Sequence, residues 1–198
     1  VNPATITFST GNWNSAQTDT VTGVDDDIVD GSVNTAITIS VNDASSDDSY
    51  DSLGNSTVTA ATADNDNAGF TVAESSGSTA VTEAGGTDSF TVVLDKAPLT
   101  DVVLTVTSGD TGEATVSPAN LTFTSGNWDS AQTVTVTGAD DSALDGTVSS
   151  TITVAVNDGS SDDAFDSVAD DTLTVTTTDN DSAGYTLSKT TATVTEAG

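Results

Sequence analysis

The sequence predicts an all-β protein made of tandem immunoglobulin-like β-sandwiches. Apolar and polar residues alternate with a period of two in many short runs, which is typical of strands with one buried face. Clusters of Gly, Asn, Asp and Ser separate these runs, and such clusters end strands. A stretch of about 115 residues occurs twice, which indicates an array of modules.

The repeat predicts the domain boundaries. We expect the C-terminal part of a first repeat at residues 1–67, a complete repeat at 68–182 and the start of a third repeat at 183–198. Recent duplication alone explains the high identity between the copies, so the repeat establishes an array and not a function. Because the first and third repeats are partial, we expect the chain to be a segment of a longer repeat protein.

Each strand of the complete repeat is predicted from its own alternation. About seven strands in roughly 110 residues, with frequent turns between them, favour a β-sandwich of immunoglobulin-like shape. Only 34% of the residues are hydrophobic, so the expected core is thin. The alternating apolar positions lie in residues 90–94, 102–106, 121–123, 134–136, 152–156 and 173–175.

The charge of the chain is strongly negative. The chain has thirty-one acidic residues and only two basic ones, Lys96 and Lys189, which gives a net charge of −29. Such a surface repels nucleic acid and anionic membranes, and it repels itself at low salt. Divalent cations would offset this repulsion. An acidic surface adapted to high salt is the alternative explanation.

The missing residue types exclude several kinds of site. The chain has no Cys, Met or His, so it has no disulfide, no thiolate zinc site and no imidazole base. A pair of carboxylates could also serve a glycosidase. However, aromatic residues are only 5% of the chain and no large apolar pocket is predicted, so we expect no enzyme activity.

Acidic residues gather in loops that a sandwich brings to the same end. Calcium (Ca2+) binds six to eight oxygen ligands with tolerant geometry, and magnesium prefers fewer carboxylates and more water. The sequence therefore predicts calcium sites. The candidate ligands are Glu83, Asp140, Asp141, Asp145, Asp179 and Asp181 in the complete repeat, and Asp25, Asp26, Asp30, Asp64 and Asp66 in the first.

Turn formation is the competing explanation for these residues. Asp and Asn are good turn residues, and Asp145-Gly146 alone is a hairpin signal. For the aspartates among the calcium candidates, recurrence of their cluster in both copies favours metal binding. For Asp110 and Glu113 we favour a role in a turn.

Five stretches of the sequence carry recognisable motifs: Thr82–Gly86, Val116–Thr124, Asn127-Trp128, Ala131–Gly138 and Thr178–Asp181. Together they resemble the Calx-beta-like repeats of giant bacterial surface adhesins that are exported by type I secretion. The resemblance covers the whole chain in phase with the repeat. It implies seven-stranded sandwiches that bind calcium at one end, with Glu83 as an early ligand and Asn180 as a departure from an all-Asp run.

The resemblance also implies a function and partners. Such modules act as extenders that hold an adhesive tip away from the cell, and calcium near each junction would stiffen the stalk. We therefore expect an extracellular structural protein whose partners are neighbouring repeats of the same chain or adjacent identical subunits. The alternative is a subunit of a self-assembling extracellular filament or surface layer.

Overall fold

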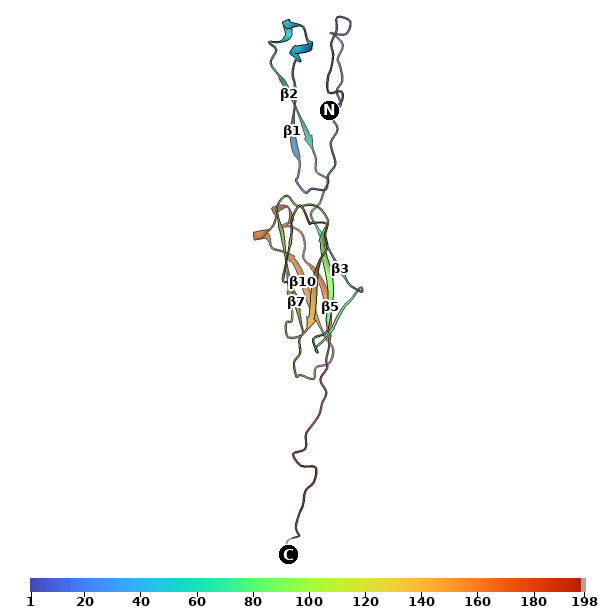
Figure 1. The fold of residues 1–198 in the computed structure, drawn as a ribbon, viewed down its shortest axis with the longest axis vertical. Coiled ribbons are helices and arrows are strands. Elements are labelled where there is room, and N and C mark those ends of the chain that lie inside the picture. Colours follow the sequence, from blue (N-terminus) through green and yellow to red (C-terminus); the bar gives the residue numbers. More distant parts are fainter. Residues whose placement is uncertain (197–198) are drawn as a thin grey trace.

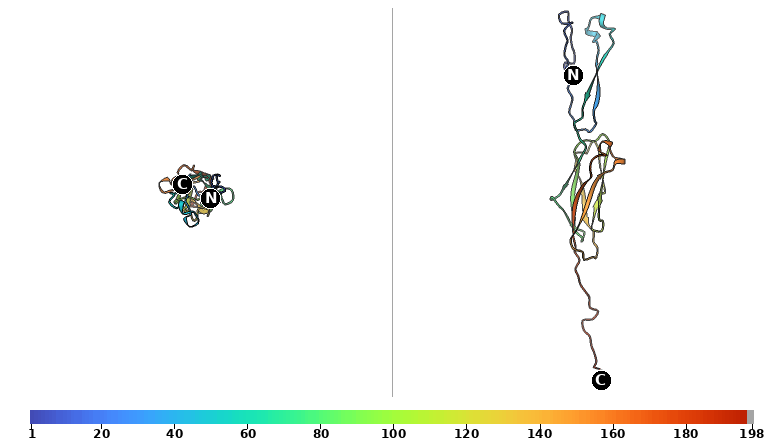
Figure 2. Two further views of the ribbon diagram at one scale, coloured as in Figure 1. Left: turned by 90° about the horizontal axis from the view of Figure 1, so that it is seen from above. Right: turned by 180° about the vertical axis from the view of Figure 1, so that it is seen from behind.

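The protein is an elongated rod in the computed structural model, which describes residues 1–196 (Figure 1). Residues 1–67 form a first unit at one end, a β-sandwich follows, and residues 183–196 extend from the other end as a single thread. The view along the long axis shows how narrow the rod is (Figure 2). Among the described residues, no helix has the length and apolar character that a membrane crossing needs.

The first unit contains one regular β-hairpin and two short 3-10 helices. Strand β1 (Val33–Ile39) pairs in antiparallel fashion with β2 (Ser56–Thr62), and η1 (Asp43–Ser45) and η2 (Asp48–Tyr50) lie between them. Residues 1–20 form a second, irregular hairpin in which Asn2 pairs with Thr20.

The complete module is a sandwich of two sheets, which confirms the predicted fold class. One sheet has the strand order β3-β5-β9-β7 and the other β4-β11-β10-β6-β8. The strands are β3 (Phe70–Glu74), β4 (Thr79–Thr82), β5 (Thr87–Leu94), β6 (Val102–Ser108), β7 (Ala114–Ser117), β8 (Asn120–Phe123), β9 (Gln132–Gly138), β10 (Val148–Val156) and β11 (Asp171–Thr178), with η3 (Asp158–Ser160) and η4 (Asp163–Phe165) before the last.

The module has nine strands rather than about seven because two stretches change sheets. β3 and β4 follow each other across a short turn, but they belong to opposite sheets. β7 and β8 likewise pair with β9 and β6 on opposite sides, and the break between them falls at Pro118, which has no N–H for a sheet ladder. The apolar residues alternate with a period of two on both sides of each break. This period does not reveal which sheet a strand joins.

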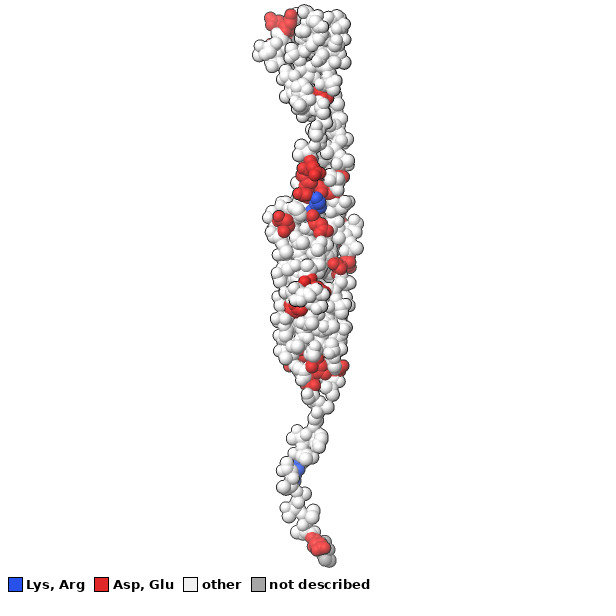
Figure 3. All heavy atoms as spheres, turned by 90° about the vertical axis from the view of Figure 1, so that its right-hand side faces the viewer, with Lys and Arg blue, Asp and Glu red and all other residues white. Residues whose placement is uncertain are grey.

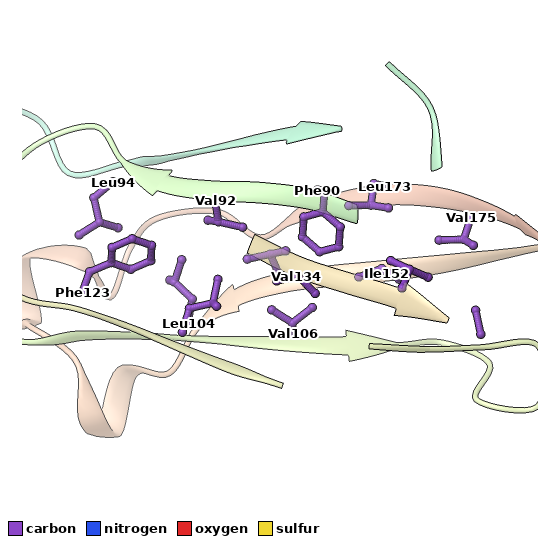
Figure 4. Close-up of a cluster of buried hydrophobic side chains, with 14 of the residues drawn as sticks. Phe90, Val92, Leu94, Leu104, Val106, Phe123, Val134, Ile152, Leu173 and Val175 are labelled. Carbon is purple, nitrogen blue, oxygen red and sulfur yellow. The ribbon is translucent and has the colours of Figure 1, made fainter. Parts of the chain in front are cut away.

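The core lies between the two sheets of the complete module (Figure 4). Most of its side chains come from the alternating positions that the sequence predicts, whereas Val81, Ala114 and Phe165 lie outside those runs. Burial of apolar area is the main force that holds the sheets together. The fully buried large residues include Phe90, Phe123, Phe165, Leu104, Leu121 and Ile152.

The first unit has no comparable core among its described residues. Phe8 and Trp13 are 57% and 71% exposed, whereas Phe123 is fully buried and Trp128 packs against the core. These residues occupy the same places in the repeat, but residues 1–67 contain no counterpart of β3 to β6. The first copy therefore leaves its apolar faces open to solvent in this structure.

Candidate metal centre

Glu83 lies in the turn between β4 and β5. This turn is at the far end of the sandwich, which is the end that faces away from the first unit. Its N–H donates to Thr178 O at 3.1 Å, which fixes the end of β4 against β11. The turn continues through Gly85, which has φ +80°, a conformation that favours glycine. The Glu83 side chain is only 1% exposed. A carboxyl group this deeply buried needs a compensating partner.

Gly138, at the end of β9, allows this turn to approach. A Cβ at this position would lie 2.1 Å from Thr82 O, so any larger residue would push the turn away. Gly138 N–H also donates to Gly86 O at 2.9 Å. The absence of a side chain at residue 138 is therefore part of how Glu83 is positioned.

Glu113 comes from the turn that precedes β7. The backbone is held tightly, since Ala139 N–H donates to Glu113 O at 2.8 Å and Thr177 Oγ1 donates to the same oxygen at 3.3 Å. The residue is 7% exposed, and its Oε2 atom has no hydrogen-bond partner among the described residues. An unpartnered buried carboxylate oxygen is rare in folded proteins and calls for a cation or a proton.

Asp179 and Asp181 follow β11, and the backbone holds Asp179 in one orientation. Asp181 N–H donates to Asp179 Oδ1 at 2.6 Å, and Gly146 N–H donates to Asp179 Oδ2 at 2.9 Å. Gly146 has φ +77°, which turns its N–H toward the carboxylate. The Oδ2 atom of Asp181 is buried and has no hydrogen-bond partner among the described residues.

These acidic residues form two overlapping groups that could hold metal ions. One group is Glu83, Asp179 and Asp181, and the other is Glu83, Glu113 and Asp145; in each group the ligand oxygens lie within 4.8 Å of one another. Glu83 belongs to both groups. All five residues lie at the end of the module that faces away from the first unit, where acidic side chains gather on the surface (Figure 3).

The carboxyl groups of the centre shift the pKa values of their neighbours. Burial, followed by nearby aspartates such as Asp179 and Asp145, raises the pKa of Glu83. Burial and neighbouring carboxylates raise the pKa of Glu113 and of Asp181 in the same way. The backbone N–H groups of Asp181 and Gly146 instead lower the pKa of Asp179. The centre is thus a set of carboxylates that lacks a positive charge.

Asp140 and Asp141, two of the predicted ligands, lie outside these two groups. Asp140 Oδ1 accepts from Asn180 Nδ2 at 3.0 Å, and Asp141 Oδ1 accepts from Ala143 N–H at 2.6 Å. Both bonds shape the loop after β9. Glu113 lies in a turn, as the sequence predicts. The sequence does not predict that it meets Glu83 and Asp145; its position in a loop at the same end of the sandwich was the available signal.

The predicted ligands of the first repeat lie at the junction with the complete module. Asp64 accepts from Asp66 N–H at 2.7 Å and Gly31 N–H at 2.7 Å, as Asp179 does in the complete module. Asp26 Oδ1 accepts from Ile28 N–H at 3.0 Å, and Asp25 is exposed. Asp30 N–H also donates to Asp64. Residues 1–67 contain no counterpart of Glu83 or Glu113, so this group is incomplete.

Lys96 crosses from the complete module to the first unit. Its Nζ atom lies 2.7 Å from Asp27 Oδ1 and 2.6 Å from Asp66 Oδ1. The backbone adds to this contact, since Ala97 N–H donates to Asp27 O at 2.8 Å and Val29 N–H donates to Ala97 O at 3.0 Å. The junction is therefore held by the ion pairs of Lys96 and by a short stretch of backbone pairing.

Comparison of the chain with protein-family models and with curated proteins gave no match. Solved structures with similar folds include domains 1–6 of the surface layer protein SbsC, at 24% identity and a TM-score of 0.38, covering 63% of this chain and 15% of that one. Domains 4 and 5 of the same protein match at 26% identity and a TM-score of 0.36, covering 62% and 52%.

A third similar structure is the PapD-like domain 7 of human CEP192, at 13% identity and a TM-score of 0.37, covering 58% of this chain and 87% of that one. The chain thus spans about a seventh of the first of these surface-layer structures and about half of the second. The fold itself is defined by the two sheets of the complete module.

Proposed function

We propose that this protein is a calcium-binding structural module of an extracellular array of repeats. The observation that carries the proposal is the meeting of Glu83, Glu113, Asp145, Asp179 and Asp181 within two overlapping groups. Two of these carboxyl groups are more than nine-tenths buried, and buried charges in proteins are paired or coordinate metals. A divalent cation would provide the missing positive charge.

Calcium fits these ligands better than other metals. All of the candidate ligands are oxygen atoms, and the chain has no His or Cys that would suit zinc or copper. The groups combine several carboxylates from four separate loops, and calcium accepts many oxygen ligands in irregular geometry. The resemblance of the sequence motifs to Calx-beta repeats supports the same metal.

The test is calcium titration of the metal-free chain by isothermal calorimetry. We expect binding by the unaltered chain and a loss of at least one binding event in Glu83→Gln, because Glu83 belongs to both groups. Asp129→Asn is the matched control, since Asp129 is an exposed carboxylate outside both groups. Equal binding by the two variants, or no binding by the unaltered chain, would refute the proposal.

In this proposal the module works as an extender and performs no catalysis. The rod shape and the backbone pairing across the junction support a role in spanning distance. Calcium at the module ends would fix the loops that face the next module. The array would stand outside the cell and hold another part of the protein away from the surface.

Self-assembly into a filament or surface layer is the second candidate. It is favoured by the contacts at the junction. The ion pairs of Lys96 and the backbone pairing of Ala97 need no covalent link between the two modules, so separate chains can make them as well as neighbouring repeats. Sedimentation velocity of the chain over a range of concentrations separates the candidates: growing assemblies support self-assembly, whereas a concentration-independent monomer supports the extender.

A further inference from the structure

The junction between the first unit and the complete module uses a loop that the complete module repeats at its far end. In the first copy, the loop presents Asp27 O and Val29 N–H to Ala97 of the next module. The matching groups at the far end are Ser142 O and Leu144 N–H. Neither of these two groups has a backbone hydrogen-bond partner among residues 1–196.

The two loops share two hydrogen bonds at matching positions. Asp26 accepts from Ile28 N–H, and its counterpart Asp141 accepts from Ala143 N–H. In the same way, Gly31 N–H donates to Asp64 and Gly146 N–H donates to Asp179. These two bonds hold the matching parts of the two loops in the same way.

The side chains at the far end lack the contacts that their counterparts make at the first junction. Val29 packs against the core of the complete module, whereas its counterpart Leu144 is 62% exposed. Asp66 Oδ1 pairs with Lys96, whereas the counterpart Asp181 has a buried Oδ2 atom with no hydrogen-bond partner among the described residues.

We propose that the far end of the complete module is a docking surface for a further module of the same kind, in the register of the first junction. The occupant is a module with the loop Asp95-Lys96-Ala97, whose lysine pairs with Asp181 and whose alanine pairs with residues 142–144. A carboxylate has two oxygens, so Asp181 can contact this lysine and a metal ion together. The inference rests on the proposed array and adds the surface and the partner.

The test extends the chain by one module. Residues 194–198 repeat residues 81–85, so adding a second copy of residues 86–182 after Gly198 continues the repeat without a gap. The chain has no cysteine, so spin labels can be placed by Thr59→Cys and Thr174→Cys, which are matching exposed positions on β2 and β11. Distances between labels are then measured by pulsed electron paramagnetic resonance.

Two distances are compared. One joins Thr59 and Thr174 across the existing junction, and the other joins Thr174 and its counterpart in the added module. We expect the same peak distance and a similar width for both. A broad distribution, or a peak at another distance, would overturn the proposal.

Two variants remove the named contacts and change no residue of the hydrophobic core. Leu144→Ser and replacement of the lysine in the added loop by alanine should each cause loss of the shared peak while the added module stays folded by circular dichroism. Lys189→Ala is the control and should leave the peak in place. An unchanged peak in both test variants would also overturn the proposal.

Calcium titration of the same extended chain separates this inference from the proposed function. Matching distances without calcium binding would support docking and refute the calcium-binding role. Calcium binding without matching distances would support the calcium-binding role and refute docking.

Discussion

Glu113 shows at the scale of one residue how the carboxylates of the centre repel one another. Its carboxyl group is buried, its Oε2 atom lacks a hydrogen-bond partner among the described residues, and aspartates surround it. Neutralising it removes a repulsion when no cation is present. When calcium is bound, the same change removes a ligand.

We therefore predict opposite effects of Glu113→Gln in the two conditions. The melting temperature should rise in metal-free protein and fall in saturating calcium at the same ionic strength. Differential scanning calorimetry measures both, with Asp129→Asn as a control that changes neither by a comparable amount. A decrease in both conditions would contradict the assignment of Glu113 to the centre.

The raised pKa values of Glu83, Glu113 and Asp181 predict how stability depends on pH. A carboxyl group with a raised pKa binds its proton more tightly in the folded state, so folding is favoured at low pH. Metal-free protein should lose stability as the pH rises from the ordinary values of 4.5 for Glu and 3.8 for Asp through the raised values.

Calcium should reverse this trend, because it binds the ionised carboxylates and its affinity rises with pH. The lowered pKa of Asp179 changes the stability only below pH 3.8, the ordinary pKa of Asp, so it does not affect the trend at higher pH. Melting temperatures between pH 4 and pH 7 with and without calcium provide the measurement. Parallel curves in the two conditions would show that these carboxyl groups do not bind the ion.

At the scale of single elements, the end of β9 controls the centre through Gly138. The added methyl group of Gly138→Ala would collide with Thr82 O and displace the turn that holds Glu83. We predict a loss of about 1–3 kcal/mol in the free energy of unfolding, as for other overpacked sites.

Gly23 is the matched control, because it is the same residue in the first copy. A Cβ there would meet only Thr62 Cγ2, at 3.6 Å, which is ordinary contact. Gly23→Ala should change the free energy of unfolding by less than about 0.5 kcal/mol. Urea unfolding curves of the two variants test the difference, and equal losses would show that the close approach at Gly138 is unimportant.

The elements also show what sequence can predict. Strands such as β5 and β10 are predictable because a buried face imposes alternation on every second residue. The change of sheet between β3 and β4 was not predicted, because alternation is equally compatible with either sheet. The place of Glu113 in the acidic group was not predicted, because an exposed turn carboxylate and a buried one look the same in sequence until the fold shows which carboxylates meet.

The whole molecule carries a net charge of −29, and its far-end centre is only one part of that charge. Screening by salt lowers the repulsion between all exposed charges, because the Debye length falls from about 10 Å at 0.1 M to about 3 Å at 1 M. Calcium acts at a few buried carboxylates instead. The two effects can therefore be separated.

We predict that chelation at fixed ionic strength lowers the melting temperature, and that added sodium chloride restores only part of the loss. Binding to the folded state alone contributes about 2.7 kcal/mol when free calcium is a hundredfold above its dissociation constant. Thermal melts in chelator, in calcium and in 1 M salt make the comparison. Full recovery in salt, with no effect of calcium, would favour the acidic surface as the whole explanation.

The parallel pairing of β4 with β11 has a consequence for a protein under tension. The four register pairs run from Thr79 and Val175 to Thr82 and Thr178. The chain enters the complete module at the end near the first unit and leaves at the opposite end (Figure 1). A pull along the rod therefore draws β4 and β11 past each other lengthwise. All the hydrogen bonds of this pair then resist the force together, rather than opening one after another as they would if the strands were peeled apart.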